Sequence, residues 1–203
     1  MDNTFKIYND FSEFKKVFLR ENSLLNLISK NDEKVLWEKH IYDSLSIKLF
    51  EAKYGIKKGY ALLDIGCGGG FPSVPIAVEY PELEVTAIDS IRKKINAVNN
   101  IKISLNLSNL TAICNRVENI KDKKFDIITS RAVAELGKII EYALPLLKKD
   151  GYFIAYKSKK TKEELDNAKN VLKKFNADVV DIIEYTLPLD EVYRRNLIII
   201  RFK

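Results

Sequence analysis

The chain has 203 residues, a length that fits one domain, and 46% of them are hydrophobic, so it can bury a core without a metal or disulfide staple. Its net charge of +6, from 34 Lys and Arg against 28 Asp and Glu, permits a polyanionic partner without requiring one. Two separated cysteines and a single histidine, His40, argue against a His/Cys metal site or a Ser-His-Asp triad, and we expect no metal.

We expect no signal sequence, because no basic segment precedes an apolar one after Met1. The longest apolar runs are about as long as a strand, far short of the ~20 residues of a membrane span. The cysteines, Cys67 and Cys114, fit free thiols in a reducing cytosol. We therefore expect a cytoplasmic protein without membrane contact, and a monomer.

Apolar residues recur at three- and four-residue spacing over residues 10–54, which predicts helices. From residue 60 onward, short apolar runs alternate with amphipathic segments, as in a parallel sheet with right-handed crossovers. Strands are expected over residues 60–65, 83–89, 110–114, 125–130, 152–156, 178–187 and 196–202. Helices are expected over residues 75–80, 91–105, 135–147 and 165–175, and Asp150-Gly151 is expected to end the third of them.

This order of elements predicts an α/β fold of the Rossmann-like type. We expect a seven-stranded, mostly parallel sheet with helices on both faces, whose last two strands form an antiparallel pair at one edge. The whole chain, residues 1–203, is expected to be a single domain. Within it, residues 1–58 form a helical N-terminal extension and residues 59–203 form the α/β core.

The most informative segment is Asp64-Ile65-Gly66-Cys67-Gly68-Gly69-Gly70, which follows a strand and precedes a helix. Its glycines allow a sharp turn and let a ligand touch bare backbone. The dinucleotide fingerprint needs a glycine where Phe71 stands, and no Lys-Ser/Thr follows, so a P-loop is excluded. Gly-x-Gly-x-Gly after an acidic residue resembles the first motif of methyltransferases that use S-adenosylmethionine (SAM), and Gly66 and Gly68 are candidate cofactor contacts.

Two later segments support a nucleoside-like ligand. Asp89 ends the second strand, 19 residues after Gly70, where a carboxylate can accept hydrogen bonds from both ribose hydroxyls. Its alternative role is to cap the helix that begins near Ile91. Val117 and Glu118 follow the third strand, where a backbone N–H and an apolar side chain suit adenine; Glu118 taken alone also fits a solvated surface charge.

The linear order of several further motifs resembles the family of small-subunit ribosomal RNA guanine-N7 methyltransferases called RsmG or GidB. The matching pieces are Asn26-Leu27, Lys39 to Ser44, the glycine loop continued through Phe71-Pro72-Ser73-Val74-Pro75, Arg116-Val117-Glu118, and Phe125 to Ala132. The resemblance covers nearly the whole chain. It implies a class I methyltransferase fold and cofactor contacts by Gly66, Phe71, Val117, Glu118 and Arg131. The substrate would be a guanosine of 16S ribosomal RNA, free or in the small ribosomal subunit, methylated at N7.

No general base is expected for this reaction, because guanine N7 carries an in-plane lone pair and no proton. Phe71 would exclude water beside the cofactor, or else simply pack in the core. Arg131 would pair with the SAM carboxylate or bind guanine O6, or else form a structural ion pair. His40 is expected to be a hydrogen-bonded structural residue.

Basic residues near the ends of two later strands are candidate RNA contacts, namely Lys157, Arg194 and Arg195. A lysine run also fits a solvated loop. Two other functions stay open from the residues alone. One is a small-molecule SAM-dependent methyltransferase, and the other is a non-enzymatic module that binds SAM or RNA.

Overall fold

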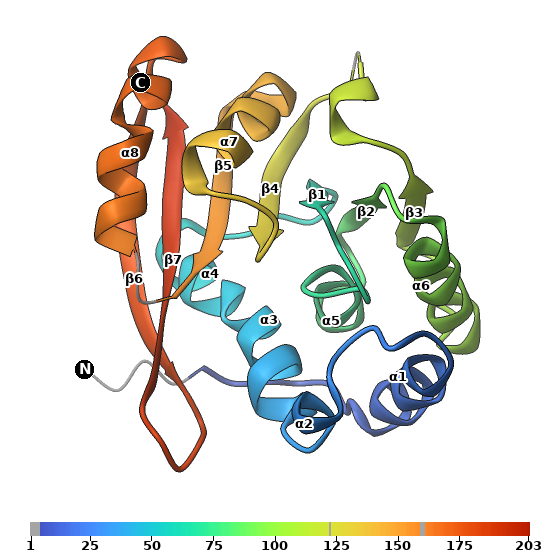
Figure 1. The fold of residues 1–203 in the computed structure, drawn as a ribbon. Helices are drawn as coiled ribbons and strands as arrows, with labels where there is room; N and C mark the ends of the chain where they lie inside the picture. The colour runs from blue at the N-terminus through green and yellow to red at the C-terminus, as the bar shows by residue number, and fades with distance from the viewer. Residues whose placement is uncertain (1–4, 122, 159–160) are drawn as a thin grey trace.

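The computed structural model describes residues 5–121, 123–158 and 161–203, which form one seven-stranded sheet in the order β3-β2-β1-β4-β5-β7-β6 (Figure 1). The strands are β1 Ala61–Ile65, β2 Glu84–Asp89, β3 Leu110–Cys114, β4 Phe125–Arg131, β5 Leu147–Lys157, β6 Ala177–Leu187 and β7 Tyr193–Phe202. Strands β1 to β5 pair in parallel, whereas β7 is antiparallel to both β5 and β6. The predicted fold class and the antiparallel edge pair are confirmed.

Helices cover both faces of the sheet (Figure 1). They are α1 Ser12–Leu25, α2 Lys30–Glu33, η1 Trp37–Tyr42, α3 Asp43–Leu45, α4 Ile47–Tyr54, α5 Ser73–Glu79, α6 Arg92–Ser104, η2 Val117–Asn119, α7 Leu136–Ala143, η3 Leu144–Leu146 and α8 Thr161–Lys174. Strand side chains alternate between two clusters: Leu62 packs with the N-terminal helices, α5 and α6, and Leu63 packs with α7 and α8. Burial on both faces explains the continuous apolar strands.

The predicted N-terminal helices are confirmed, and they pack into the same cluster as the sheet. Phe14 and Phe18 of α1 contact Phe71 after β1, with ring centroids 5.8 and 4.9 Å apart. The segment η1 is a π-helical turn, a wide form that is rare and often found at functional sites. The division of the chain at residue 58 stays a prediction.

The expected helix over residues 135–147 was too long at its C-terminal end. α7 ends at Ala143, a short 3-10 turn follows, and β5 begins at Leu147. Leu147 pairs with Phe125, but Tyr152 pairs with Ile127, so Asp150 and Gly151 lie in an irregularity inside β5. The turn residues therefore bend a strand where they were expected to end a helix. A side chain at position 151 would meet the Asp126 carbonyl at 2.8 Å.

Other helix and strand boundaries differ from the predicted ones by a few residues. α8 begins at Thr161, four residues before the expected start, and β7 begins at Tyr193, three residues early. Within the part of the chain that the structure describes, no helix is both long and apolar enough to cross a bilayer.

Candidate active site

The glycine loop lies at the carboxyl end of β1 and is held by backbone hydrogen bonds. The N–H groups of Gly66 and Cys67 donate to the Ile88 carbonyl at 2.8 and 3.0 Å. Gly66 and Gly68 have positive φ angles of 73° and 56°, which disfavour any residue with a Cβ. An ideal Cβ on Gly68 would meet nothing within 4 Å, so bare backbone borders open space here. This cradle is what a nucleoside ligand such as SAM requires.

Asp89 joins the loop to the next helix. Its Oδ2 accepts the Gly68 N–H at 3.0 Å and its Oδ1 accepts the Ile91 N–H at 2.8 Å. Ile91 is the residue before α6, and no side-chain hydrogen bond caps that helix, so Asp89 holds the turn that leads into α6 and the capping role considered from the sequence is wrong. A carboxylate oxygen has two lone pairs, and each oxygen uses one here, so one on each remains for ribose hydroxyls. Holding this turn and binding ribose are therefore compatible roles for Asp89.

A hollow of about 430 Å³ opens beside Asp89. Val117 forms part of its wall and is buried, whereas Glu118 lines it with an exposed side chain. Both residues lie in η2, whose first N–H groups have no intrahelical partner. The dimensions and the polar and apolar walls suit the adenosine part of SAM.

A second, wider hollow of about 750 Å³ lies between the sheet and the N-terminal helices. It shares Gly66, Lys94, Ala132 and Val133 with the first hollow, so the two meet at the glycine loop. Ala132 has a φ of 56°, an uncommon conformation for a residue with a Cβ. Local strain of this kind often accompanies functional sites.

Arg131 is held at the wall of the wider hollow by three acceptors from one N-terminal turn. Its Nη1 donates to the Lys39 carbonyl at 3.0 Å and to Asp43 Oδ2 at 2.9 Å. Its Nη2 lies 3.0 Å from His40 Nδ1. The ion pair with buried Asp43 is the structural role considered for Arg131. A guanidinium has five N–H groups, so these contacts leave two for a ligand.

The carboxylate of Asp43 contacts several side chains at this end of the site. The Tyr185 hydroxyl donates to its Oδ1 at 2.7 Å, and Arg195 Nε lies 3.8 Å from the same oxygen. The side chain of Asp43 is only 4% exposed, so its charge relies on these partners and on Arg131. Segments far apart in sequence thus meet at one carboxylate.

Two buried groups have strongly shifted protonation equilibria. Burial, reinforced by the Arg131 cation, lowers the pKa of His40 to about 4, so the imidazole is neutral at pH 7. Burial raises the pKa of Asp64 to about 6, although hydrogen bonds from Ser73 and Thr129 oppose that shift. Asp64 lies beneath the glycine loop and ties β1 to α5 and β4.

Phe71 is 4% exposed and lies in an aromatic cluster. Its ring centroid is 5.0 Å from that of His40 and 5.3 Å from the Arg131 guanidinium carbon. It also lines the wider hollow, so core packing and contact with a ligand are both open to it.

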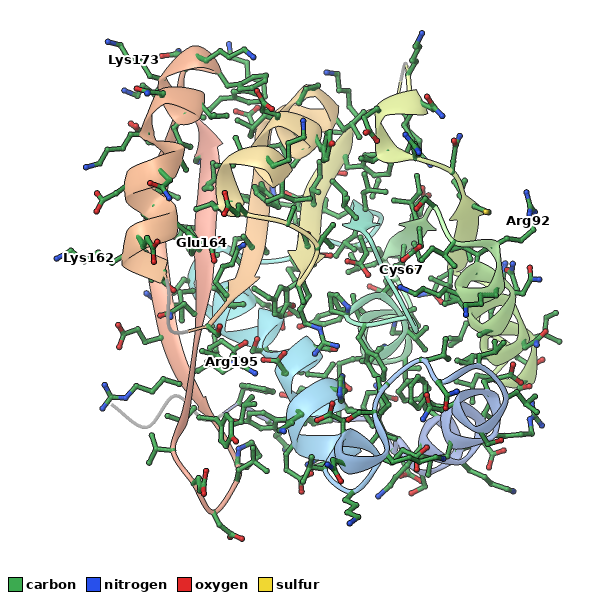
Figure 2. The ribbon with its side chains drawn as sticks, in the orientation of Figure 1. Cys67, Arg92, Lys162, Glu164, Lys173 and Arg195 are labelled. Carbon is green, nitrogen blue, oxygen red and sulfur yellow. The ribbon has the colours of Figure 1, made fainter. Side chains whose placement is uncertain are left out.

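The candidate RNA contacts differ from one another in their surroundings. Lys157 is 11% exposed and its ammonium contacts Glu164 and the Ala134 carbonyl, at 2.5 and 2.9 Å. Glu164 also accepts the Leu136 N–H at 3.0 Å and points from α8 toward the sheet (Figure 2). Arg194 is exposed, whereas Arg195 is partly buried and lines the wider hollow.

The lysine run around residues 157–162 falls partly outside the described residues, at 159–160. Lys162 points away from the sheet (Figure 2), which agrees with a solvated charge. No local pattern in the sequence assigns a site role to Lys39, His40 or Asp43, which line the wider hollow. Their only signal was the resemblance of the Lys39–Ser44 segment to a family motif.

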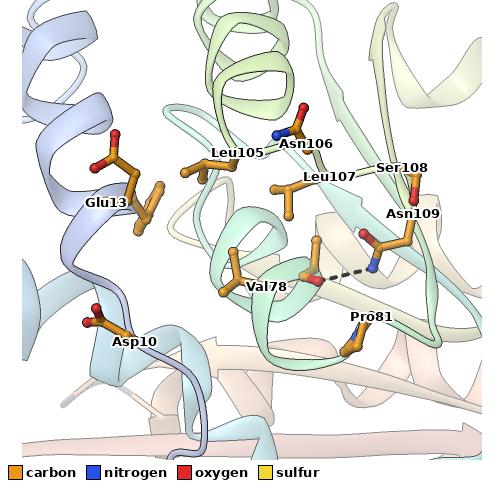
Figure 3. A pocket seen from close by; sticks show the side chains of 11 residues that line it. Asp10, Glu13, Val78, Pro81, Leu105, Asn106, Leu107, Ser108 and Asn109 are labelled. Carbon is orange, nitrogen blue, oxygen red and sulfur yellow. Dashed lines mark hydrogen bonds between the residues drawn. The ribbon is translucent and has the colours of Figure 1, made fainter.

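A third hollow, of about 290 Å³, is separate from this site. It lies between α1, α5 and the turn after α6, where Val78, Leu105 and Leu107 line it (Figure 3). Asn109 Nδ2 donates to the Ala77 carbonyl at 3.0 Å at its edge. None of the predicted site residues lines it. Among the described residues, no group of three His, Cys, Asp or Glu side chains is placed to hold a metal.

Solved structures share this architecture. A ribosomal protein L11 methylase from Lactobacillus delbrueckii subsp. bulgaricus superposes with a TM-score of 0.61 and 16% identity, over 80% of each chain. TYW2 of M. jannaschii, solved in complex with AdoMet, gives 0.60 and 16% over 79% of this chain and 77% of that one. The fold is therefore that of class I SAM-dependent methyltransferases.

Sequence comparison defines the group within that class. The family model described as GidB, rRNA small subunit methyltransferase G, matches residues 7–192. Ribosomal RNA small subunit methyltransferase G of Lachnoclostridium phytofermentans is 39% identical over 202 residues, covering 97% of this chain and 79% of that protein. The chain belongs to the rRNA small subunit methyltransferase G family. The resemblance seen in the sequence, the enzyme class and SAM as methyl donor are thereby confirmed.

Proposed function

We propose that this chain methylates N7 of a guanosine in 16S ribosomal RNA. Adenosine would bind in the hollow of about 430 Å³ beside Asp89, and the target guanine in the wider hollow of about 750 Å³. The observation that carries this assignment is the junction of the two hollows at Gly66, Ala132 and Val133. A transfer reaction needs donor and acceptor to meet in line, and this junction is the place where the two can approach each other. Family membership supports the substrate class.

SAM supplies an electrophilic methyl group on a positively charged sulfur. Guanine N7 would form the new bond to that methyl carbon with its lone pair, while the sulfur–methyl bond would break with its electrons on sulfur, leaving a neutral thioether and a positively charged guanine. No proton is released, so no residue needs to act as a base. Holding the reactants in line can lower the barrier by up to ~7–11 kcal/mol. Orientation by the protein is therefore the main source of rate acceleration, which agrees with a site whose histidine, His40, is neutral at pH 7.

Each predicted residue has a role in this proposal. The Gly66 and Gly68 backbone makes room for the cofactor, Asp89 accepts the ribose hydroxyls, and the Val117-Glu118 turn contacts adenine. Phe71 closes the wall behind the reacting atoms. Arg131 directs its remaining N–H groups into the wider hollow, toward the SAM carboxylate or guanine O6.

Arg194 and Arg195 are proposed to face RNA phosphates at the open side of the wider hollow. Lys157 enters the proposal differently, because its buried ammonium is already paired with Glu164. We assign it to holding the loop between Arg131 and Leu136. The target base must be unpaired or turned out of its stack to reach the site. We expect the enzyme to act as a monomer in the cytoplasm.

The test is methyl transfer from labelled SAM to small ribosomal subunits from a strain that lacks the modification, and to the free rRNA of the same strain. Label recovered as 7-methylguanosine in rRNA supports the proposal. Fully modified subunits are the control and should take up no label. Exclusive labelling of a small metabolite, or SAM binding without turnover on either RNA substrate, would instead support one of the two alternative functions.

A further inference from the structure

We infer that His40 is a positioning residue whose Nδ1 lone pair fixes the guanidinium of Arg131 at the wall of the wider hollow. This inference rests on the proposed function, because it assumes that Arg131 serves the bound reactants. Nothing in the reaction itself calls for a histidine, since no proton is transferred. The argument therefore starts from the contact between the two side chains.

The contact fixes the tautomer of His40. Arginine has only donors, so a guanidinium nitrogen 3.0 Å from Nδ1 requires an unprotonated Nδ1 with its lone pair directed at Arg131. The ring proton is then on Nε2. Protonating both nitrogens would turn the acceptor into a donor and place two cations in contact. The neutral state at pH 7 agrees with this arrangement.

The second ring nitrogen of His40, Nε2, argues against a role in stability alone. Nε2 is buried and has no hydrogen-bond partner among the described residues. A buried N–H without a partner costs roughly 1–3 kcal/mol, so a side chain kept for stability alone would have both nitrogens bonded or none. Of the two ring nitrogens of His40, only Nδ1 has a hydrogen-bond partner among the described residues, and that partner is Arg131.

The surrounding charges complete the arrangement. Burial is the largest influence on the pKa of His40 and lowers it; Arg131 and Lys39 also lower it, whereas Asp32 and Asp43 raise it. Asp43 and the Lys39 carbonyl take both hydrogens of Nη1, so His40 is the third acceptor around the same guanidinium. These three acceptors, two from the π-helical turn η1 and one from the first residue of α3, define the plane of the guanidinium as well as its position, and the plane decides where the last two N–H groups point.

Two nearly isosteric variants separate the acceptor from the rest of the ring. In His40→Asn, the side-chain oxygen can take the place of Nδ1, whereas His40→Leu has the same shape and no lone pair. Both lose the ring contact with Phe71 to the same extent. Thermal unfolding of both purified variants shows whether each is folded before its activity is measured.

We expect His40→Leu to lower kcat/KM for the RNA substrate roughly 10-fold to 100-fold, the range of one hydrogen bond to a charged group. His40→Asn should stay within about threefold of the wild type, because the acceptor is restored. Equal losses in the two variants would overturn the inference, and so would a His40→Leu enzyme with wild-type kinetics.

A double-variant cycle separates this inference from the proposed function. In an Arg131→Ala background, His40→Leu should change kcat/KM by less than about twofold, because the group it orients is gone. If Arg131→Ala itself has wild-type activity, the assignment of Arg131 in the proposed function fails. If Arg131→Ala is impaired and His40→Leu still adds its full loss there, only the positioning role fails.

Discussion

The two ends of the site are built in different ways. The walls of the adenosine end come mainly from residues 65–118, joined by Ala132, Val133 and Tyr142, and include the glycine loop at Gly66, the turn η2 and the carboxylate of Asp89. The substrate end brings together distant segments, and the contacts of Arg131 with Lys39, His40 and Asp43 span 88 to 92 residues. A backbone cradle recognises a cofactor by shape, whereas a side-chain network can be adjusted to a particular substrate.

The strongest test of the backbone cradle is Gly68→Val. A branched Cβ would project into the open space of the cradle and would strain a φ of 56°, so we expect SAM affinity to fall by at least about 100-fold. Isothermal titration calorimetry measures the loss. Gly59→Val is the matched control, because Gly59 has a φ of 77° and open space around its Cβ but lines none of the described hollows. Normal SAM binding by Gly68→Val would refute the cradle.

Arg131→Ala tests the side-chain end. We expect kcat/KM to fall roughly 30-fold to 100-fold while the protein stays folded, since Asp43 keeps the Tyr185 hydroxyl and Arg195. Steady-state methylation kinetics and thermal unfolding of the same preparation measure both quantities. Arg201→Ala is a control at the far end of β7, where Arg201 contacts Tyr152. Unchanged turnover in Arg131→Ala would remove this residue from the site.

Asp89→Asn should have a smaller effect on the cofactor end. An amide can accept only one of the two N–H groups that the carboxylate now accepts, from Gly68 and Ile91. We expect SAM to bind about 10-fold more weakly and the free energy of unfolding to fall by about 1–3 kcal/mol. Calorimetry and urea denaturation measure the two losses. A change in stability without a change in affinity would leave Asp89 only the role of holding the turn before α6.

The smallest effect is expected at the RNA-facing arginine. Arg194→Ala should weaken binding to rRNA about threefold to fivefold and reduce the salt dependence of the binding constant by about one counterion. Lys157→Met should leave that salt dependence unchanged, because the Lys157 ammonium is buried against Glu164. Filter binding at several salt concentrations distinguishes the two. If Lys157→Met reduced the salt dependence and Arg194→Ala left it unchanged, Lys157 would be an RNA contact and Arg194 would not.

The predictable part of this molecule was the part with local signals. Alternating strands and helices gave the sheet, and the segment from Asp64 to Gly70 predicted the loop at the end of β1, because its glycines permit positive φ angles. The start of β5 was missed because Asp150-Gly151 has the same turn composition whether it ends a helix or bends a strand.

The rest depended on contacts that no local pattern encodes. Neither the pairing of Lys157 with Glu164 nor the three acceptors around Arg131 can be read from spacing, because each depends on how distant strands and helices pack. The π-helical turn could not be predicted from the sequence, because a periodic apolar pattern indicates a helix but not whether it is an α-helix or the wider π-helix. The roles of individual site residues stay predictions.

The π-helical turn Trp37–Tyr42 makes the enzyme sensitive to chain length in an unusual way. Removing one residue there would tighten the turn to an ordinary α-helix and rotate everything on one side of the cut by about 100° relative to the other. His40 and Asp43 would then no longer face the same arginine. A three-base in-frame deletion in this short stretch of the gene should therefore disable methylation more thoroughly than most single substitutions.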